Sequence, residues 1–261
     1  MKNNTNKTAI ILAGSEGIGL ACAEALSRKK FNTIIFSRNK KKATLAKAYL
    51  ETKGLSLDSF TGDLSSVKDL KNLFSYVNKK YGGCDVLINN NSGPSPGSLL
   101  DLDMDSWTET FNSHFLPIVS SIKEVVPNMK KNNWGRIITI ASIAVKEPIE
   151  NLDLSNFFRS GIASINKTLS RELAKYNINC HLVCPGSILT NRSKLLIKNR
   201  AEKLNISFQD SKKITEDRIP LGRIGDPEDV GNLVAFLASE ESKYMTGNVI
   251  QIDGGMTNGI F

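Results

Sequence analysis

The sequence has no apolar run of the length that a membrane-spanning helix needs, which is roughly eighteen to twenty residues. Its few cysteines show neither metal-ligand pairing nor the density of a disulfide-stapled secreted domain. The polar start of the chain has no apolar segment followed by a small-residue cleavage site, so we expect no secretory signal. These absences lead us to expect a cytoplasmic protein with no membrane partner.

Histidine is also scarce, at two residues, and no set of His, Cys and carboxylate residues has metal-ligand spacing, so we expect no metal. The net charge is +8, with basic clusters at 28–30, 38–42 and 130–131. Solvated helix ends explain such clusters. The other interpretation is an anionic partner, namely a dinucleotide phosphate, an acyl-CoA or an acidic carrier protein. No recognition motif or aromatic-interleaved basic strip is present, so we expect no nucleic-acid partner.

Short β-branched apolar runs alternate with longer amphipathic stretches along the whole chain. The predicted strands are Thr8–Leu12, Thr33–Phe36, Leu57–Thr61, Val86–Asn89, Arg136–Ile140, Asn179–Cys184 and Asn248–Ile252. The predicted helices are Gly19–Lys29, Lys40–Lys53, Val67–Tyr81, Trp107–Met129, Asn156–Lys175 and Pro227–Leu237. This alternation predicts an α/β fold of the Rossmann type, a doubly wound parallel seven-stranded sheet. No linker or repeat divides the chain, so we expect residues 1–261 to form one domain.

One polar segment, residues 187–218, interrupts the alternation and carries only two weak helical patterns. Irregular segments of that length in compact domains are usually functional flaps. We interpret residues 187–218 as a substrate lid.

A glycine-rich turn joins the first predicted strand to the first predicted helix, as Gly14-Ser15-Glu16-Gly17-Ile18-Gly19. Such a turn lets the backbone approach a pyrophosphate, which is held by the helix amides and dipole. A glycine-rich turn is weak evidence alone, but its place in a βαβ unit favours dinucleotide binding. The candidate residues here are Gly14, Ser15, Gly17, Ile18 and Gly19.

Further motifs follow in a fixed order along the chain: Asp63-Leu64, Asn89-Asn90-Asn91-Ser92, Pro185-Gly186 with Thr190, and Asp253-Gly254-Gly255. Together with the glycine-rich turn, they make the whole chain resemble the short-chain dehydrogenase/reductase family. The resemblance implies that the cofactor contacts Asp63 and Leu64 near the adenine, and Pro185, Gly186 and Thr190 near the nicotinamide. It also implies a cofactor contact at Asn90, after the fourth strand. Ala13 replaces the first glycine of the family turn, and we expect it to need ordinary backbone angles.

The end of the second predicted strand indicates which dinucleotide is preferred. NAD-selective enzymes usually have an acid there, which accepts from the ribose 2′-hydroxyl. This chain has Ser37-Arg38-Asn39 instead. Arg38 can pair with a 2′-phosphate through two hydrogen bonds. We therefore expect NADP(H) as the cofactor, with Ser37 and Arg38 contacting it; the alternative is that Arg38 is a solvated strand-end residue.

The resemblance also implies four catalytic positions, filled in the family by Asn, Ser, Tyr and Lys. Asn112 and Ser142 match the first two, but Ser155 and Arg159 stand where Tyr and Lys are expected. A serine hydroxyl is a much weaker acid than a phenol, and Arg159 does not deprotonate. Arg159 keeps the positive charge that holds the nicotinamide ribose. Losing a positioned general acid typically costs about 10²- to 10⁴-fold in rate.

Three interpretations remain open. In the first, the protein is an NADP(H)-dependent reductase of a carbonyl or 3-oxoacyl thioester, resembling a subgroup described as 3-oxoacyl carrier-protein reductases. The proton then comes from Lys146, from Glu147 or from a water organised by Ser155 and Asn112. Alternatively, the scaffold performs non-redox chemistry such as dehydration, isomerisation or cyclisation, or is a silent oligomer partner. The resemblance also implies a homotetramer or homodimer, with the Trp107 and Asn156 helices at one interface and Asn248–Ile252 at another.

Overall fold

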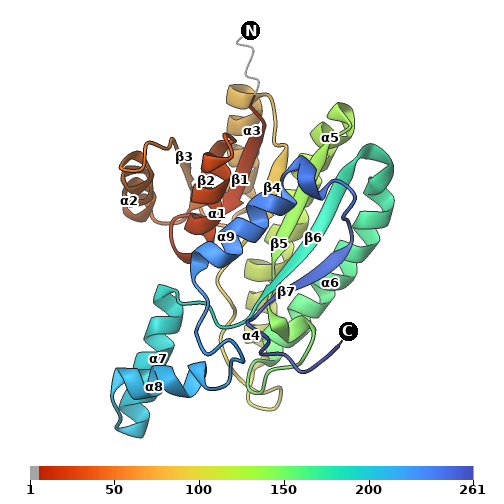
Figure 1. The fold of residues 1–261 in the computed structure, drawn as a ribbon. Helices are drawn as coiled ribbons and strands as arrows, with labels where there is room; N and C mark the ends of the chain where they lie inside the picture. The colour runs from red at the N-terminus through yellow and green to blue at the C-terminus, as the bar shows by residue number, and fades with distance from the viewer. Residues whose placement is uncertain (1–5, 261) are drawn as a thin grey trace.

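The computed structural model describes residues 6–260 and contains one seven-stranded parallel sheet with the order β3-β2-β1-β4-β5-β6-β7 (Figure 1). The strands are β1 (Thr8–Leu12), β2 (Asn32–Ser37), β3 (Asp58–Thr61), β4 (Val86–Asn89), β5 (Gly135–Ile140), β6 (Ile178–Pro185) and β7 (Asn248–Ile252). All seven predicted strands are confirmed, three of them with identical bounds. Among residues 6–260, no helix combines the length and the hydropathy required to cross a membrane.

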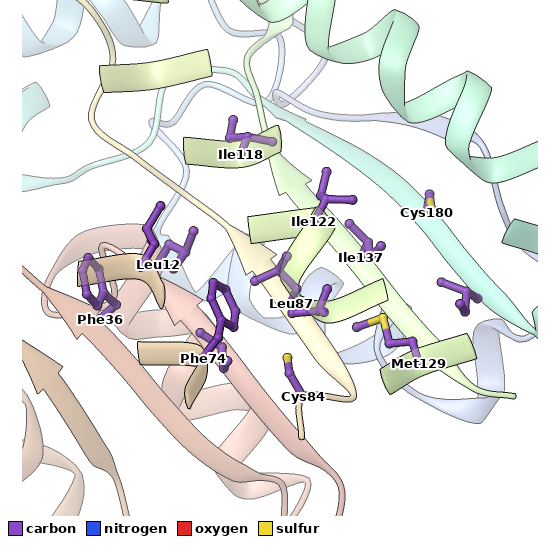
Figure 2. Close-up of a cluster of buried hydrophobic side chains, with 14 of the residues drawn as sticks. Leu12, Phe36, Phe74, Cys84, Leu87, Ile118, Ile122, Met129, Ile137 and Cys180 are labelled. Carbon is purple, nitrogen blue, oxygen red and sulfur yellow. The ribbon is translucent and has the colours of Figure 1, made fainter. Parts of the chain in front are cut away.

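Helices cover both faces of the sheet, which confirms the doubly wound fold. They are α1 (Gly17–Arg28), α2 (Lys40–Glu51), α3 (Val67–Tyr81), α4 (Met104–Thr110), α5 (Leu116–Asn132), α6 (Asp153–Leu173), α7 (Asn191–Leu204), α8 (Phe208–Glu216) and α9 (Pro227–Leu237). Apolar residues of α1, α2 and α9 pack on one face, and those of α3, α5 and α6 pack on the other. Figure 2 shows the second layer, where Phe74 and Ile122 lie over Leu87.

The helix predicted at Trp107–Met129 is divided in the structure. A π-helical turn, Phe111–Phe115, separates α4 from α5. The Leu116 N–H donates to the Phe111 carbonyl, five residues back, instead of the usual four. Pro117 follows directly and has no N–H to continue the ordinary ladder. The turn shifts which side chains of this segment face the sheet.

The polar segment at residues 187–218 folds into two helices, α7 and α8, which confirms the two weak helical patterns. Figure 1 shows them as a hairpin that projects from the body of the molecule, beyond the edge where β5 and β6 end. A small separate apolar cluster of Ile197, Ile219 and Ile224 anchors the hairpin.

The outer strand β3 is joined to α3 by a polar cluster around Asp58. Its carboxylate accepts hydrogen bonds from Lys80 (2.7 Å), Tyr76 (2.5 Å) and Tyr81 (2.8 Å). Burial alone would raise the pKa of Asp58, but these three donors outweigh burial and lower that pKa to about 2. The charged form of Asp58 therefore stabilises the fold.

We predict that Asp58→Asn lowers the free energy of unfolding at pH 7 by about 1–2 kcal/mol. Because the pKa of Asp58 in the folded state lies below its unfolded value of about 3.9, this contribution is present above pH 4 and declines as the pH falls toward 2. Urea unfolding at several pH values measures the difference. The exposed Asp105→Asn is the control, and an Asp58→Asn difference that does not shrink below pH 4 would contradict this explanation.

Candidate functional site

The glycine-rich turn leaves β1 and enters α1 at the carboxyl edge of the sheet. A side chain at Gly14 would place its Cβ 2.5 Å from Cγ2 of Ile35, so only glycine fits against β2 there. Gly17 has a φ of +54°, in the left-handed region that favours glycine. Ile18 and Gly19 then form the first turn of α1. The turn thus presents bare backbone at the start of the helix.

Ala13 differs from the sequence-based expectation of ordinary backbone angles, because its φ is +47°. The Asn90 side-chain amide donates to the carbonyls of Leu12 (3.3 Å) and Ala13 (3.2 Å), and the Gly14 N–H donates to the Phe36 carbonyl (3.1 Å). These hydrogen bonds hold the turn in place. They keep Ala13 at a positive φ, which residues with a side chain disfavour. Asn90 is therefore a structural part of the turn as well as a candidate cofactor contact.

Among residues 6–260, no side chain caps the first-turn amides of α1. Its N-cap residue is Glu16, whose carboxylate instead binds Lys42 (2.7 Å) and Asn191 (3.3 Å). Five other helices begin with a capping side chain, namely α2, α3, α4, α7 and α8. Free amides at a helix start with a glycine turn in front of them fit an anionic pyrophosphate.

The ends of β2 and β3 lie beside this turn. The Ser37 hydroxyl donates to Oγ of Ser15 (2.9 Å), and the next residue, Arg38, is exposed. Hydrogen bonds from Ser65 lower the pKa of Asp63, and the charge of Arg38 lowers it further. Arg38 and Asp63 therefore lie near each other, with Leu64 following in the same loop.

The segment after β6 approaches the glycine-rich turn from the other side. Gly186 packs so closely on Asp253 that a Cβ would lie 2.7 Å from the Asp253 Cβ. Thr190 caps α7, and its Cγ2 lies 3.2 Å from the position that a Cβ on Gly17 would take. Thr190 therefore lies beside the glycine-rich turn, and Pro185 and Gly186 precede it in the same segment after β6. This arrangement fits a dinucleotide that extends across the carboxyl edge of the sheet.

The other candidate residues gather past the end of β5. The Ser142 Oγ accepts from the Ala144 N–H (3.1 Å), which leaves the hydroxyl proton of Ser142 available. Arg159 on α6 donates from Nε to the Ser155 Oγ (3.0 Å) and from Nη1 to the Ile140 carbonyl (3.3 Å). The guanidinium of Arg159 is therefore held at the carbonyl of Ile140, which lies two residues before Ser142 in the chain.

Arg159 is positively charged at neutral pH. Burial, opposed in part by Cys184 and assisted by the nearby charge of Arg192, lowers the pKa of Arg159 to about 10. Lys146, in the loop after Ser142, is half-buried and lies near enough for its charge to act on Cys184. The site therefore contains several cations and a free serine hydroxyl.

The structure does not bring Asn112 to this group: its side chain is exposed, and it makes no hydrogen bond with residues 6–260. His114, two positions on in the π-helical turn, lies there instead. Burial lowers the pKa of His114, and the charges of Arg159 and Arg192 lower it further. Its Nδ1 lies 2.7 Å from the Ser113 Oγ, and its buried Nε2 has no hydrogen-bond partner among residues 6–260.

Sequence reasoning missed His114 because it matched Asn112 to the asparagine of the family, on a helix predicted to run unbroken from Trp107 to Met129. Residues two apart face different sides of a helix, and the π-helical turn decides which side faces the sheet. The scarcity of histidine was the only signal in the sequence: one of two histidines lies in this turn. Elsewhere, residues 6–260 contain no group of three or more His, Cys, Asp or Glu residues placed to hold a metal ion.

Comparisons with known proteins agree with this geometry. A family model described as enoyl-(acyl carrier protein) reductase matches residues 12–257. The chain is 33% identical to the NADPH-dependent reductase BacG of Bacillus subtilis (strain 168), over 98% of this chain and 100% of BacG. It is 31% identical to dehydrogenase/reductase SDR family member 4 of Oryctolagus cuniculus, over 96% of this chain and 93% of that protein.

A solved structure shows the same fold. The L-sorbose reductase of Gluconobacter frateurii, crystallised with NADPH and L-sorbose, matches with a TM-score of 0.93 and 26% identity. The match covers 98% of this chain and 98% of the reductase. The fold is therefore shared over nearly the whole length of both chains.

We predict that Ala13→Gly raises the free energy of unfolding by about 0.5–1 kcal/mol, because relief of the left-handed backbone exceeds the extra entropy of glycine in the unfolded chain. Ala48→Gly, an exposed position in α2, is the matched control and should lower stability by about 1 kcal/mol. Urea unfolding of both variants gives the comparison. Equal destabilisation by the two changes would show that Ala13 is not strained.

Proposed function

Because the chain belongs to the short-chain dehydrogenase/reductase family, we propose that it is an oxidoreductase that reduces a carbonyl group with NADPH. Two comparisons support the cofactor: BacG is described as NADPH-dependent, and the L-sorbose reductase was crystallised with NADPH. The 3-oxoacyl thioester remains one candidate form of the carbonyl substrate. The observation that carries the proposal is the Arg159–Ser155 pair, held to the end of β5 two residues before Ser142, on the same sheet edge as the glycine-rich turn.

The residues that hold the cofactor follow from the geometry. The bare turn of Gly14, Gly17 and Gly19 and the free amides of α1 receive the pyrophosphate. Arg38 receives the 2′-phosphate, where an acid would repel it. The remaining contacts come from loops on the same edge of the sheet, namely Ser15, Ile18, Ser37, Asp63, Leu64, Asn90, Pro185, Gly186 and Thr190. When bound, the nicotinamide supplies a hydride to the carbonyl carbon.

Ser142 binds the carbonyl oxygen. Its hydroxyl oxygen already accepts from the Ala144 amide, so its proton points to an outside acceptor. The negative charge that develops on the carbonyl oxygen is stabilised by this donor and by the nearby guanidinium of Arg159. Arg159 also holds the nicotinamide ribose with the donors that Ser155 and Ile140 do not use.

The proton for the alkoxide comes from a group other than tyrosine. Arg159 remains charged and cannot relay a proton. The Ser155 hydroxyl, which accepts from Arg159, has its own proton free to order a water in the space left by the shorter side chain. Lys146, a half-buried ammonium in the adjoining loop, is the proposed proton source, with that water as the path.

Two further features complete the proposal. The α7–α8 hairpin, within residues 187–218 of the single domain, acts as the substrate lid, because it begins at Thr190 beside the glycine-rich turn.

The chain associates as a homodimer or homotetramer through the faces of α4 and α6 and through the edge strand β7. Trp107 packs against Phe157 there, and the Phe157 side chain is 62% exposed in the single chain.

We predict that Ser142→Ala lowers kcat by about 10²- to 10³-fold, because it removes a donor to the developing oxyanion. Lys146→Ala should lower kcat by about 10²-fold or more, with the loss greatest at high pH, where a substitute proton from solvent is scarce. Steady-state NADPH oxidation with a panel of ketones and oxo esters measures both effects. Lys123→Ala, an exposed change on α5, is the control. Wild-type turnover in both site variants would require this site to be abandoned.

A further inference from the structure

Arg192 lies in the first turn of the lid helix α7 and reaches back to the sheet. Its guanidinium donates from Nη1 to the Gly93 carbonyl (2.7 Å) and from Nη2 to the Pro94 carbonyl (3.1 Å). Gly93 and Pro94 belong to the loop that follows β4. Arg192 therefore places a positive charge from the lid directly beyond the carboxyl end of a central strand.

Arg159 is tied to the end of the neighbouring strand. It donates to the carbonyl of Ile140, the last residue of β5, and β4 and β5 are hydrogen-bonded neighbours with Asn89 opposite Thr139. Neighbouring strands lie about 4.8 Å apart. One guanidinium group is thus tied to a backbone carbonyl at the end of β5 and the other to carbonyls in the loop after β4, and both charges, together with burial, lower the pKa of His114.

No acid of the described chain neutralises this pair. Within residues 6–260, neither Arg159 nor Arg192 has a carboxylate oxygen within 4.0 Å. The acids in the surrounding loops are engaged elsewhere. Glu147 accepts from the Asn258 N–H (3.1 Å), and Asp253 accepts from the hydroxyl of Thr257 (2.5 Å). Lys146 adds a third cation to the same region.

The dinucleotide does not account for this charge. Its phosphates belong at the glycine-rich turn and at Arg38, and the nicotinamide end that approaches Arg159 carries a neutral ribose. Arg192 is therefore a cation without a role in holding the cofactor. Two forked guanidinium groups, each with unused N–H donors, match the paired oxygens of a carboxylate.

Resting on the proposed reductase function, we propose that the substrate is an oxo acid whose carboxylate is bound by Arg192 with support from Arg159. Ser142 takes the carbonyl oxygen, and Arg159 contacts the backbone two residues before Ser142, so the carboxylate lies close to the reducible carbonyl. This geometry favours 2-oxo or 3-oxo acids over neutral ketones. It also disfavours 3-oxoacyl thioesters, which have no charge near the carbonyl.

The test uses two matched pairs, benzoylformate with methyl benzoylformate and acetoacetate with methyl acetoacetate, together with acetoacetyl-CoA as the thioester. Calorimetry measures the binding of each acid and each ester to the full-length protein with NADP⁺, and NADPH oxidation measures turnover. We expect at least one acid to bind tighter than its ester by about 10- to 100-fold, the effect of a charge-assisted pair. Arg192→Gln should abolish this selectivity, and Arg192→Lys should restore part of it.

Lys198→Gln, on the exposed side of the same helix, is the control and should keep the selectivity of the wild type. Acid-selective binding that depends on Arg192 without any turnover would uphold the anion site and count against the reductase. Turnover of esters or of acetoacetyl-CoA without preference for an acid would uphold the reductase and overturn this inference. Equal or absent binding of the acid and ester in both pairs would overturn it as well.

Discussion

All seven strands run in the same direction, so every loop that follows a strand opens on the same edge of the sheet. Parallel pairing needs cover on both faces, and the two apolar layers supply it. Polar residues placed just after each strand therefore meet, although they are far apart in the sequence. Asn90 after β4 fixes the turn after β1, and Arg159 on α6 closes over the end of β5.

The carboxyl edge of the sheet has different chemistry after β1 and after β5. At β1, bare glycine backbone and uncapped amides leave positive potential for phosphates, and Glu16 is turned away to Lys42. Near β5, Arg159 stays protonated at neutral pH and supplies a fixed positive charge. In the proposed mechanism this charge stabilises an oxyanion and binds an anionic substrate, whereas a separate group delivers the proton. The segment that begins α7 contributes to both regions, through Thr190 and Arg192.

Local patterns predicted most of this fold, because strand and helix periods are set by neighbouring residues. Val86–Asn89 and Pro227–Leu237 have the predicted bounds. The exceptions have tertiary causes. Ala13 takes a left-handed φ because bonds from Asn90 and β2 hold the turn, which no local rule contains. Asn112 points outward because a π-helical turn rotates the segment, and this rotation brings His114 to the site instead.

Equilibrium titration with NADPH and with NADH, followed by nicotinamide fluorescence in the wild type and in Arg38→Asp, measures the cofactor preference of the protein. We expect the wild type to bind NADPH about 10- to 100-fold more tightly than NADH, because Arg38 pairs with the 2′-phosphate. Arg38→Asp should remove that preference. Equal affinity for the two dinucleotides, or no binding of either, would contradict the assignment of this protein as an NADPH-dependent reductase.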